Sequence, residues 1–233
     1  MQIGIGITTR NRREVLEDSF KNWNKYLPKN SKIVVVDDNS DVAYKYSDYY
    51  FKKNVGISKA KNKCLELLQD CDYIFLADDD VYPKTYDWYI PYVNSGLNHL
   101  CVSFETNDKG QRFAHDVFVK EQIGDYNIFN KGNGCLLFIT NKVLKEVGGF
   151  REDFVMWGNE HVEYSNRIFN KGLVEHPFVD YKHSLRLFHI KDYYGDVESS
   201  VPNDKKSSYM SENTKTLEKY IKSKDYVEYR SGC

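Results

Sequence analysis

The sequence predicts an α/β protein with a mostly parallel central sheet, flanking helices and a small antiparallel hairpin. In the first half of the chain, apolar runs typical of buried strands alternate with segments whose apolar residues recur at helical spacing. Two of these runs end in acids, "VVVDD" at 34–38 and "IFLADDD" at 74–80. Parallel strands present their carboxyl ends at one edge of the sheet, so we expect these acids to lie together at a functional edge.

The elements of the first half follow from these patterns. The run "IGIGITT" indicates a first strand, and it leads into the polar turn "RNRR". The next segment places Leu16, Phe20 and Trp23 on one helical face, with Pro28 near its end. The expected order is therefore a strand at 3–9, a helix at 12–27, a strand at 32–40, a helix at 57–69 and a strand at 72–80.

The second half is more mixed. Segments 99–106 and 112–120 flank the glycine-bearing turn "NDKGQ", which predicts a hairpin. Residues 132–150 indicate a strand, a helix and a Gly-Gly stop, and 159–171 indicate a helix ending at Gly172, followed by a strand at 173–179. The segment 199–208 has loop composition, and the last helix is expected at 211–224, capped by Ser211 or Asn213.

Composition excludes some classes of function. Lys plus Arg number 33 and Asp plus Glu number 34, so the chain lacks the basic field that sequence-independent nucleic-acid binding needs. The five cysteines form no CxxC pair, which indicates reduced thiols without a zinc site. No apolar run approaches the roughly 20 residues of a membrane span, and the first residues do not form a signal peptide. We therefore expect no transmembrane segment and a cytoplasmic protein.

The acidic run Asp78–Asp79–Asp80 carries the clearest chemistry. Carboxylates one residue apart at a strand end can hold a single Mg²⁺ or Mn²⁺ ion, which then bridges to diphosphate oxygens. The alternative is a solvated acidic turn. The apolar strand before the run and Pro83 after it favour a site.

Five segments, in order and spacing, resemble glycosyltransferases of the GT-A fold. They are "GITTRNRREVLEDSFKNW", "IVVVDDNS", "KNVGISKAKNKCLE", "YIFLADDDVYP" and "VGGFREDFVMWGNEHVEYSNRIFNKG". The resemblance is to family 2, and the Trp-Gly segment is also similar to polypeptide GalNAc-transferases and β-1,4-galactosyltransferases. It implies a Rossmann-like GT-A domain over 1–192, with 193–233 as a loop and helix that form either an acceptor-side lid or a packing helix.

The resemblance also implies a nucleotide pocket at the ends of the first strands. One of the acids Asp37 and Asp38 would contact the base, and Gly56 would let the backbone approach the nucleotide. The implied nucleotide-binding residues are Thr8, Thr9, Arg10, Asp37, Asp38, Asn54, Gly56, Lys59, Asn62 and Asp79.

For the metal, Mn²⁺ or Mg²⁺, Asp78 and Asp80 match the family's DxD motif. Ala77 stands where family 2 often has an acid, so a shifted register would give Asp79 the metal-facing role. A histidine after the strand that follows the catalytic helix matches the third metal ligand. His189 fits this place best and His183 second.

The segment "WGNEHVEYSNR" at 157–167 would form the acceptor-side wall. Trp157, Gly158 and Glu163 are the implied sugar or acceptor contacts, although Glu163 is also spaced to form a helical ion pair with Arg167. His161 replaces the aspartate that serves inverting members as general base. The base is therefore Glu160 or His161, and both are candidate catalytic residues.

Together these features predict a metal-dependent glycosyltransferase that moves a hexosyl or N-acetylhexosaminyl group from a nucleotide-sugar, in the first place a UDP-sugar, to a hydroxyl acceptor. The resemblance favours inversion, while retaining GalNAc-transferases carry Asn in place of His161. The acceptor classes left open are a glycan, a lipid-linked sugar, a protein and a modified base. The alternatives are a non-catalytic nucleotide-sugar or glycan-binding module of the same fold, and a nucleotidyltransferase.

Overall fold

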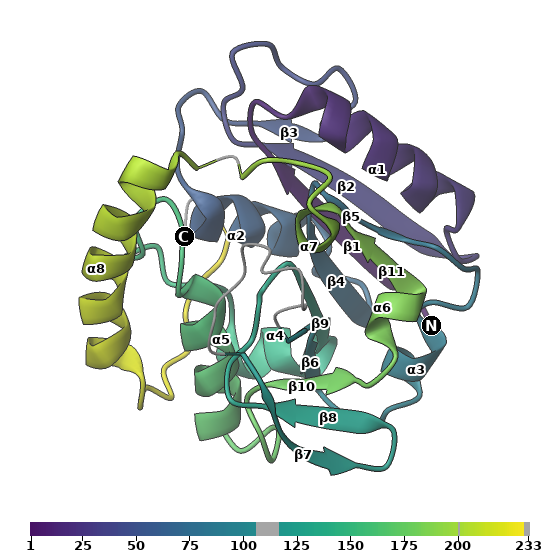
Figure 1. Ribbon diagram of the computed structural model, residues 1–233, viewed down its shortest axis with the longest axis vertical. Helices are drawn as coiled ribbons and strands as arrows, with labels where there is room; N and C mark the ends of the chain where they lie inside the picture. Colours follow the sequence, from purple (N-terminus) through teal and green to yellow (C-terminus); the bar gives the residue numbers. More distant parts are fainter. Residues whose placement is uncertain (106–116, 200, 231–233) are drawn as a thin grey trace.

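A six-stranded sheet with the order β3-β2-β1-β4-β9-β6 forms the centre of the computed structural model (Figure 1), which describes residues 1–105, 117–199 and 201–230. Strands β1, β2, β3 and β4 run parallel, whereas β9 is antiparallel to both of its neighbours. The predicted mostly parallel sheet is therefore confirmed. The strands are β1 (Ile3–Thr9), β2 (Ser31–Asp37), β3 (Tyr49–Tyr50), β4 (Tyr73–Asp78), β6 (His99–Cys101) and β9 (Leu136–Thr140).

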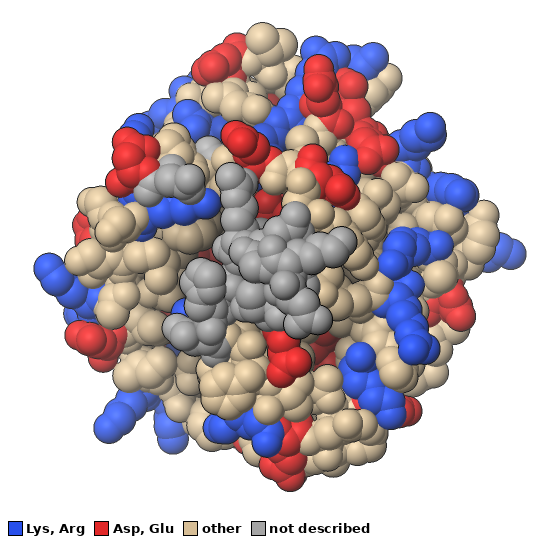
Figure 2. Space-filling view, viewed as in Figure 1, with Lys and Arg blue, Asp and Glu red and all other residues tan. Residues whose placement is uncertain are grey.

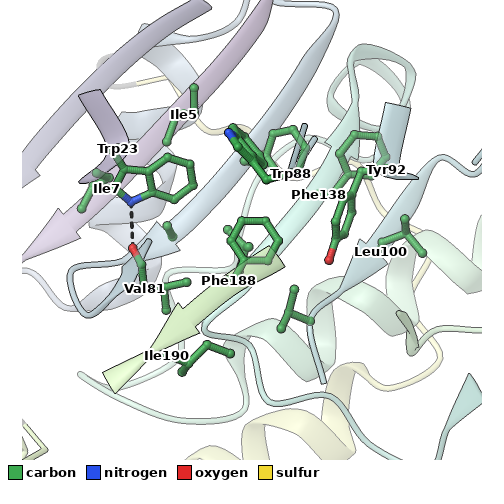
Figure 3. Close-up of a cluster of buried hydrophobic side chains, with 14 of the residues drawn as sticks. Ile5, Ile7, Trp23, Val81, Trp88, Tyr92, Leu100, Phe138, Phe188 and Ile190 are labelled. Atoms are coloured by element: carbon green, nitrogen blue, oxygen red, sulfur yellow. Dashed lines mark hydrogen bonds between the residues drawn. The ribbon is translucent and has the colours of Figure 1, made fainter. Parts of the chain in front are cut away.

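Helices cover both faces of this sheet, because the apolar side chains of each strand alternate between two cores. On one face, Ile5 and Ile7 pack with Trp23 of α1 (Arg13–Lys25) and with Trp88 (Figure 3). The Trp23 indole donates a 2.7 Å hydrogen bond to the carbonyl of Val81, so this buried ring is fully satisfied. The opposite face packs against α2 (Ile57–Leu67), α4 (Asn141–Val147) and α5 (Glu160–Asn170).

Two smaller antiparallel sheets flank the central one. One has the order β10-β8-β7, and the other pairs β5 with β11. Short helices connect this region. The remaining elements are β5 (Val81–Pro83), β7 (Val119–Ile123), β8 (Tyr126–Phe129), β10 (Val179–Tyr181), β11 (Phe188–Ile190), α3 (Ile90–Val93), α6 (Ser184–Leu187) and α7 (Lys191–Tyr194).

The structure differs from three sequence predictions in the second half. The first strand of the predicted hairpin, β6, pairs with β9, while β7 pairs with β8; the predicted turn 107–111 and residues 112–116 lie outside the described residues. The strand predicted at 173–179 forms only from Val179. The final helix, α8 (Asn203–Tyr220), begins earlier than expected, because Pro202 and the acidic residue Asp204 suit a helix start as well as a turn.

The C-terminal segment returns to the body of the protein. Helix α8 lies alongside α5 (Figure 1), and Leu217 packs on the apolar cluster that contains Val162. Beyond α8, Val227 pairs with the Gly148 turn, and the amide of Gly149 donates to its carbonyl at 2.8 Å. Among the described helices, none combines the length and the apolar character that crossing a bilayer requires.

Candidate functional site

The acids that end β4 are held by an arginine that the sequence prediction did not include. Arg12, just before α1, contacts Asp79 and Asp80 with two different guanidinium nitrogens, each at 2.9 Å. Asp79 also accepts a 2.7 Å hydrogen bond from the hydroxyl of Thr9, at the end of β1. Burial raises the pKa of Asp79 against the opposing charge of Arg12. The acids that follow β4 are therefore joined to the end of β1 and the start of α1 in one network.

A buried lysine connects this edge to the helix α5. Lys61 is 1% exposed, and its ammonium lies 3.6 Å from Asp78 and 3.5 Å from Glu160. It also donates to the carbonyl of Gly134 at 3.4 Å. Burial raises the pKa of Asp78 to about 6, with Lys61 opposing the shift. The site thus contains a strand-end acid, a cation and a helix-start acid in contact.

Two of the predicted nucleotide-binding residues on α2 lie elsewhere. Lys59 pairs with Glu152 at 2.9 Å on the surface, with both side chains more than 40% exposed. Asn62 is buried and bonds both the carbonyl and the amide of Phe150. A helical signal for Lys61 is its position one turn before the buried Leu65, whereas Lys59 is not among the buried residues of α2.

The acids after β2 shape loops. Asp37 is fully buried and accepts from the amides of Ser40 and Tyr44 at 2.8 and 3.0 Å. Asp38 accepts from the amides of Val55 and Gly56 at 2.7 and 2.9 Å, and burial raises its pKa. Asp38 therefore holds the start of α2 against the sheet edge, while Asp37 faces its own loop.

Four more predicted nucleotide contacts lie near this edge. The Thr8 hydroxyl is buried and has no hydrogen-bond partner within the described chain, so it can accept or donate a bond to a ligand. Arg10 is exposed, and the side-chain oxygen of Asn54 accepts from the amide of Gly56 at 3.2 Å. Gly56 has a φ of +86°, which favours glycine.

The start of α5 carries the two candidate catalytic residues. Glu160 is 5% exposed and accepts a 3.1 Å hydrogen bond from the amide of Gly158. Burial opposes its charge, but Lys61 and then His161 outweigh burial and lower the pKa of Glu160. The His161 ring lies against Gly134, with Nε2 3.2 Å from the carbonyl of Gly132 and Nδ1 3.5 Å from Glu160.

Glu163 has a different environment from Glu160. It is fully buried, and its carboxylate bonds Arg167 at 2.8 Å and Arg151 at 3.1 Å. Arg167 also donates to the carbonyls of Val147 and Gly149, so it ties α5 to the Gly-Gly turn. The predicted ion pair is present. The expected sugar contact is not, because this carboxylate is enclosed and fully engaged.

The predicted metal ligands do not form a complete cluster. His189 accepts or donates a 2.8 Å bond with Asp196, and its ring stacks between Tyr82 and Tyr194. Neither His189 nor His183 joins the aspartates, and the described residues contain no group of three His, Cys, Asp or Glu side chains arranged to hold an ion.

Asp192 in α7 is a carboxylate near the strand-end acids that sequence reasoning missed. Burial first, and then the charge of Asp80, raise the pKa of Asp192 to about 6. The Oδ1 atoms of both Asp78 and Asp192 are buried and accept no hydrogen bond in the described structure, and that of Asp78 lies 3.6 Å from the Lys61 ammonium. Such unsatisfied carboxylate oxygens fit a hard divalent cation. No local pattern in the sequence indicated Asp192, because its position near these acids results from the pairing of β11 with β5.

Charged side chains of both signs are interspersed on the face of the molecule shown in Figure 2, with no continuous basic field. This mixture of charges agrees with the near-zero net charge of the chain. It gives no support to sequence-independent binding of a nucleic-acid backbone.

Two families of known proteins match the two segments of the chain that carry the site residues. Residues 5–94 match glycosyl transferase family 2, and residues 118–190 match the N-terminal domain of galactosyltransferase. An uncharacterized glycosyltransferase of Acanthamoeba polyphaga mimivirus is 29% identical over 224 residues, covering 82% of this chain and 82% of the relative. The first match contains the acids of β4, and the second contains Glu160.

Solved structures share the fold at low sequence identity. The mannosyltransferase PcManGT from Pyrobaculum calidifontis, in complex with GDP-Man and Mn²⁺, has a TM-score of 0.55 at 17% identity, with 74% of this chain and 53% of that chain covered. S. aureus TarS has a TM-score of 0.57 at 13% identity, with coverages of 94% and 72%. A GalNAc transferase with UDP, GalNAc and Mn²⁺ has a TM-score of 0.58 at 14% identity, with coverages of 74% and 41%. The chain thus spans about half the length of the mannosyltransferase.

Proposed function

We propose that the chain is a glycosyltransferase of the GT-A fold that transfers a hexosyl or N-acetylhexosaminyl group from a UDP-sugar to a hydroxyl acceptor. The observation that carries this proposal is Lys61, which joins Asp78 at the strand end to Glu160 at the helix start. That contact brings a donor-side acid and an acceptor-side acid into one site. The UDP complexes of two structural neighbours support the choice of donor.

A divalent cation, Mn²⁺ or Mg²⁺, is part of the proposal. Asp78 and Asp80 would hold it. Asp192, whose buried Oδ1 accepts no hydrogen bond in the described structure, is the third ligand that we propose in place of His189, although the described side chains do not already form a three-ligand group. When bound, such an ion neutralises charge that develops on the leaving diphosphate. The guanidinium of Arg12 contacts both Asp79 and Asp80 and would hold these two carboxylates at this edge.

The donor nucleotide would lie along the ends of β1 and β2. The unpartnered hydroxyl of Thr8 and the exposed Arg10 are the groups free to contact it. Asp38 and Asn54 hold the Gly56 amide, and this fixes the backbone beside the nucleotide. We assign Lys59 and Asn62 to the scaffold, since their bonds point to Glu152 and Phe150.

The proton from the acceptor hydroxyl would go to His161, with Glu160 beside it. In the tautomer that donates from Nε2 to the carbonyl of Gly132, Nδ1 is the ring nitrogen left to take a proton, and it lies 3.5 Å from Glu160. A carboxylate there stabilises the imidazolium that forms when Nδ1 takes a proton. Glu160 itself is a weaker base, because its pKa is lowered. A base on the acceptor side suits single displacement, hence inversion.

The test is turnover of UDP- and GDP-sugars with Mn²⁺, with water and with candidate glycan acceptors. We expect UDP-sugar turnover, a large loss of kcat in His161→Asn and Glu160→Gln, and retained UDP binding in both variants. Thermal stabilisation by none of these nucleotide-sugars would exclude the transferase. Binding of UDP without any turnover would instead indicate a binding module of the same fold.

A further inference from the structure

An asparagine on α8 is buried at the back of the acceptor-side wall. Asn213 has no exposed surface, although most residues around it on α8 are exposed. Its Oδ1 accepts a 2.8 Å hydrogen bond from the amide of Val155. Its Nδ2 lies within donor distance of three carbonyls, those of Val155, Trp157 and Gly158, at 2.8 to 2.9 Å. A buried amide satisfied in this way specifies one backbone arrangement.

The backbone that Asn213 holds is an unusual one. Met156, Gly158 and Asn159 all have positive φ values, of 37°, 99° and 69°. Non-glycine residues with positive φ persist only where the surroundings hold them in place. On the side facing α2, the carbonyl of Met156 accepts from the amide of Ile57 at 3.2 Å. Asn213 supplies the hold on the side facing α8.

The same backbone positions the acceptor-side residues. The peptide carbonyl of Gly158 accepts from Asn213, while the amide of Gly158 donates to Glu160. Two further contacts from α8 reach this loop: Thr214 accepts from the side chain of Asn159 at 3.3 Å, and a Cβ at Gly158 would lie 2.7 Å from Met210 Sδ. Helix α8 is therefore packed directly against the loop that carries Trp157.

We propose that Asn213 is a positioning residue for the acceptor side of the site: it fixes the backbone at 155–158, and this backbone fixes the Trp157 ring and the Glu160 carboxylate. Helix α8 then supports the loop at 155–158 and is needed for an ordered site. The kinetic consequence rests on the proposed function, whereas the effect on the loop does not.

The loop itself can be tested without any substrate. Trp23 and Trp88 are fully buried and Trp157 is not, so acrylamide quenching in the folded protein reports on Trp157. Asn213→Ala should raise the quenching constant about twofold and speed amide exchange at 155–160, because the loop then opens locally. The matched control is Asn170→Ala, which removes two bonds to the carbonyls of Ile221 and Ser223 and leaves the loop intact.

Kinetics then separate positioning from stability. Asn213→Ala should lower kcat about 10- to 100-fold, as expected for misplaced reacting groups, with UDP–Mn²⁺ affinity and donor KM changed little. Asn213→Asp should recover activity relative to wild type as the pH falls from 8 to 6. Its protonated form regains one O–H donor, which can bond one of the three carbonyls. This second variant carries the test if the alanine variant does not fold.

Unchanged quenching and kcat in folded Asn213→Ala would overturn the proposal. So would equal losses of kcat in Asn213→Ala and Asn170→Ala, since the effect would then be one of stability alone. A wild-type protein that shows no turnover contradicts the proposed function, and in that case quenching and amide exchange still decide whether Asn213 holds the loop.

Discussion

The ammonium of Lys61 lies 3.5 Å from the carboxylate of Glu160, and this buried pair joins α2 to α5. Both side chains are almost completely enclosed, at 2% and 6% exposure. Burial opposes the charge on Lys61, yet Asp78 and then Glu160 outweigh burial and raise the pKa of Lys61. The proposed donor-side acid Asp78 and the proposed acceptor-side acid Glu160 therefore share one cation.

Removing that cation should destabilise the protein strongly. Lys61→Met leaves Glu160 and Asp78 without their common partner, and breaking a buried ion pair costs about 3–5 kcal/mol. Lys59→Met, on the same helix, removes only an exposed pair with Glu152, which is worth about 0–1 kcal/mol. Urea unfolding at pH 7.5 measures both, and equal losses in the two variants would show that Lys61 is not an essential counter-ion.

Local patterns in the sequence predicted the central sheet, because its strands are apolar runs of the right length, and they also predicted the edge where the acids gather. They did not distinguish Lys61 from Lys59, since that choice depends on which side of α2 faces α5. Asp192 depends similarly on the pairing of β11 with β5. Asn213 was predicted as a possible helix cap, and only the packing of α8 on α5 shows that it lies inside the helix and bonds a distant loop.

Two glycines with the same positive φ provide a test of the His161 environment. Gly134 and Gly172 both have a φ of +79°, so alanine at either position pays a similar left-handed penalty of about 1–2 kcal/mol. At Gly134 the added Cβ would also meet the His161 ring, whereas at Gly172 it would meet nothing within 4 Å. Gly134→Ala should therefore lose about 1–3 kcal/mol more than Gly172→Ala.

The same two variants, Gly134→Ala and Gly172→Ala, separate an effect on catalysis from a loss of stability. If His161 takes the acceptor proton, displacement of its ring in Gly134→Ala should reduce kcat, while Gly172→Ala retains it under conditions where both are folded. Urea unfolding and turnover are measured on the two variants side by side. Similar kcat values would argue against His161 as the proton acceptor.

The third carboxylate of the proposed metal site can be identified by binding alone. Asp192→Asn should weaken Mn²⁺ binding in the presence of UDP by about tenfold or more, as the loss of a ligand or its close support does. His189→Gln should bind Mn²⁺ like the wild type, because His189 is paired with Asp196 and stacked between two tyrosines. Calorimetric titration measures both, and the reverse order would restore His189 as the ligand.

The buried His99 should make stability depend on pH. Its ring is 1% exposed, with Nδ1 2.9 Å from the carbonyl of Phe138 and Nε2 2.8 Å from the hydroxyl of Ser165. Burial lowers the pKa of His99 to about 4, against about 6.5 in an unfolded chain. Between these values the unfolded chain binds a proton that the folded chain does not. The contribution of the neutral His99 to the free energy of unfolding is thus fully present above pH 6.5 and is lost as the pH falls toward 4.

This loss should amount to about 3 kcal/mol over the whole window. Other groups also titrate there, so the quantity to compare is the difference in unfolding free energy between wild type and His99→Asn, measured by urea unfolding at several pH values. That difference should shrink from pH 7 to pH 4.5, because the asparagine cannot take up the proton. Ser165→Ala removes the bond to Nε2 but keeps the buried imidazole, so it should retain the wild-type pH slope. A difference that stays constant with pH would mean that His99 has the same pKa in the folded and unfolded chains, and would contradict this prediction.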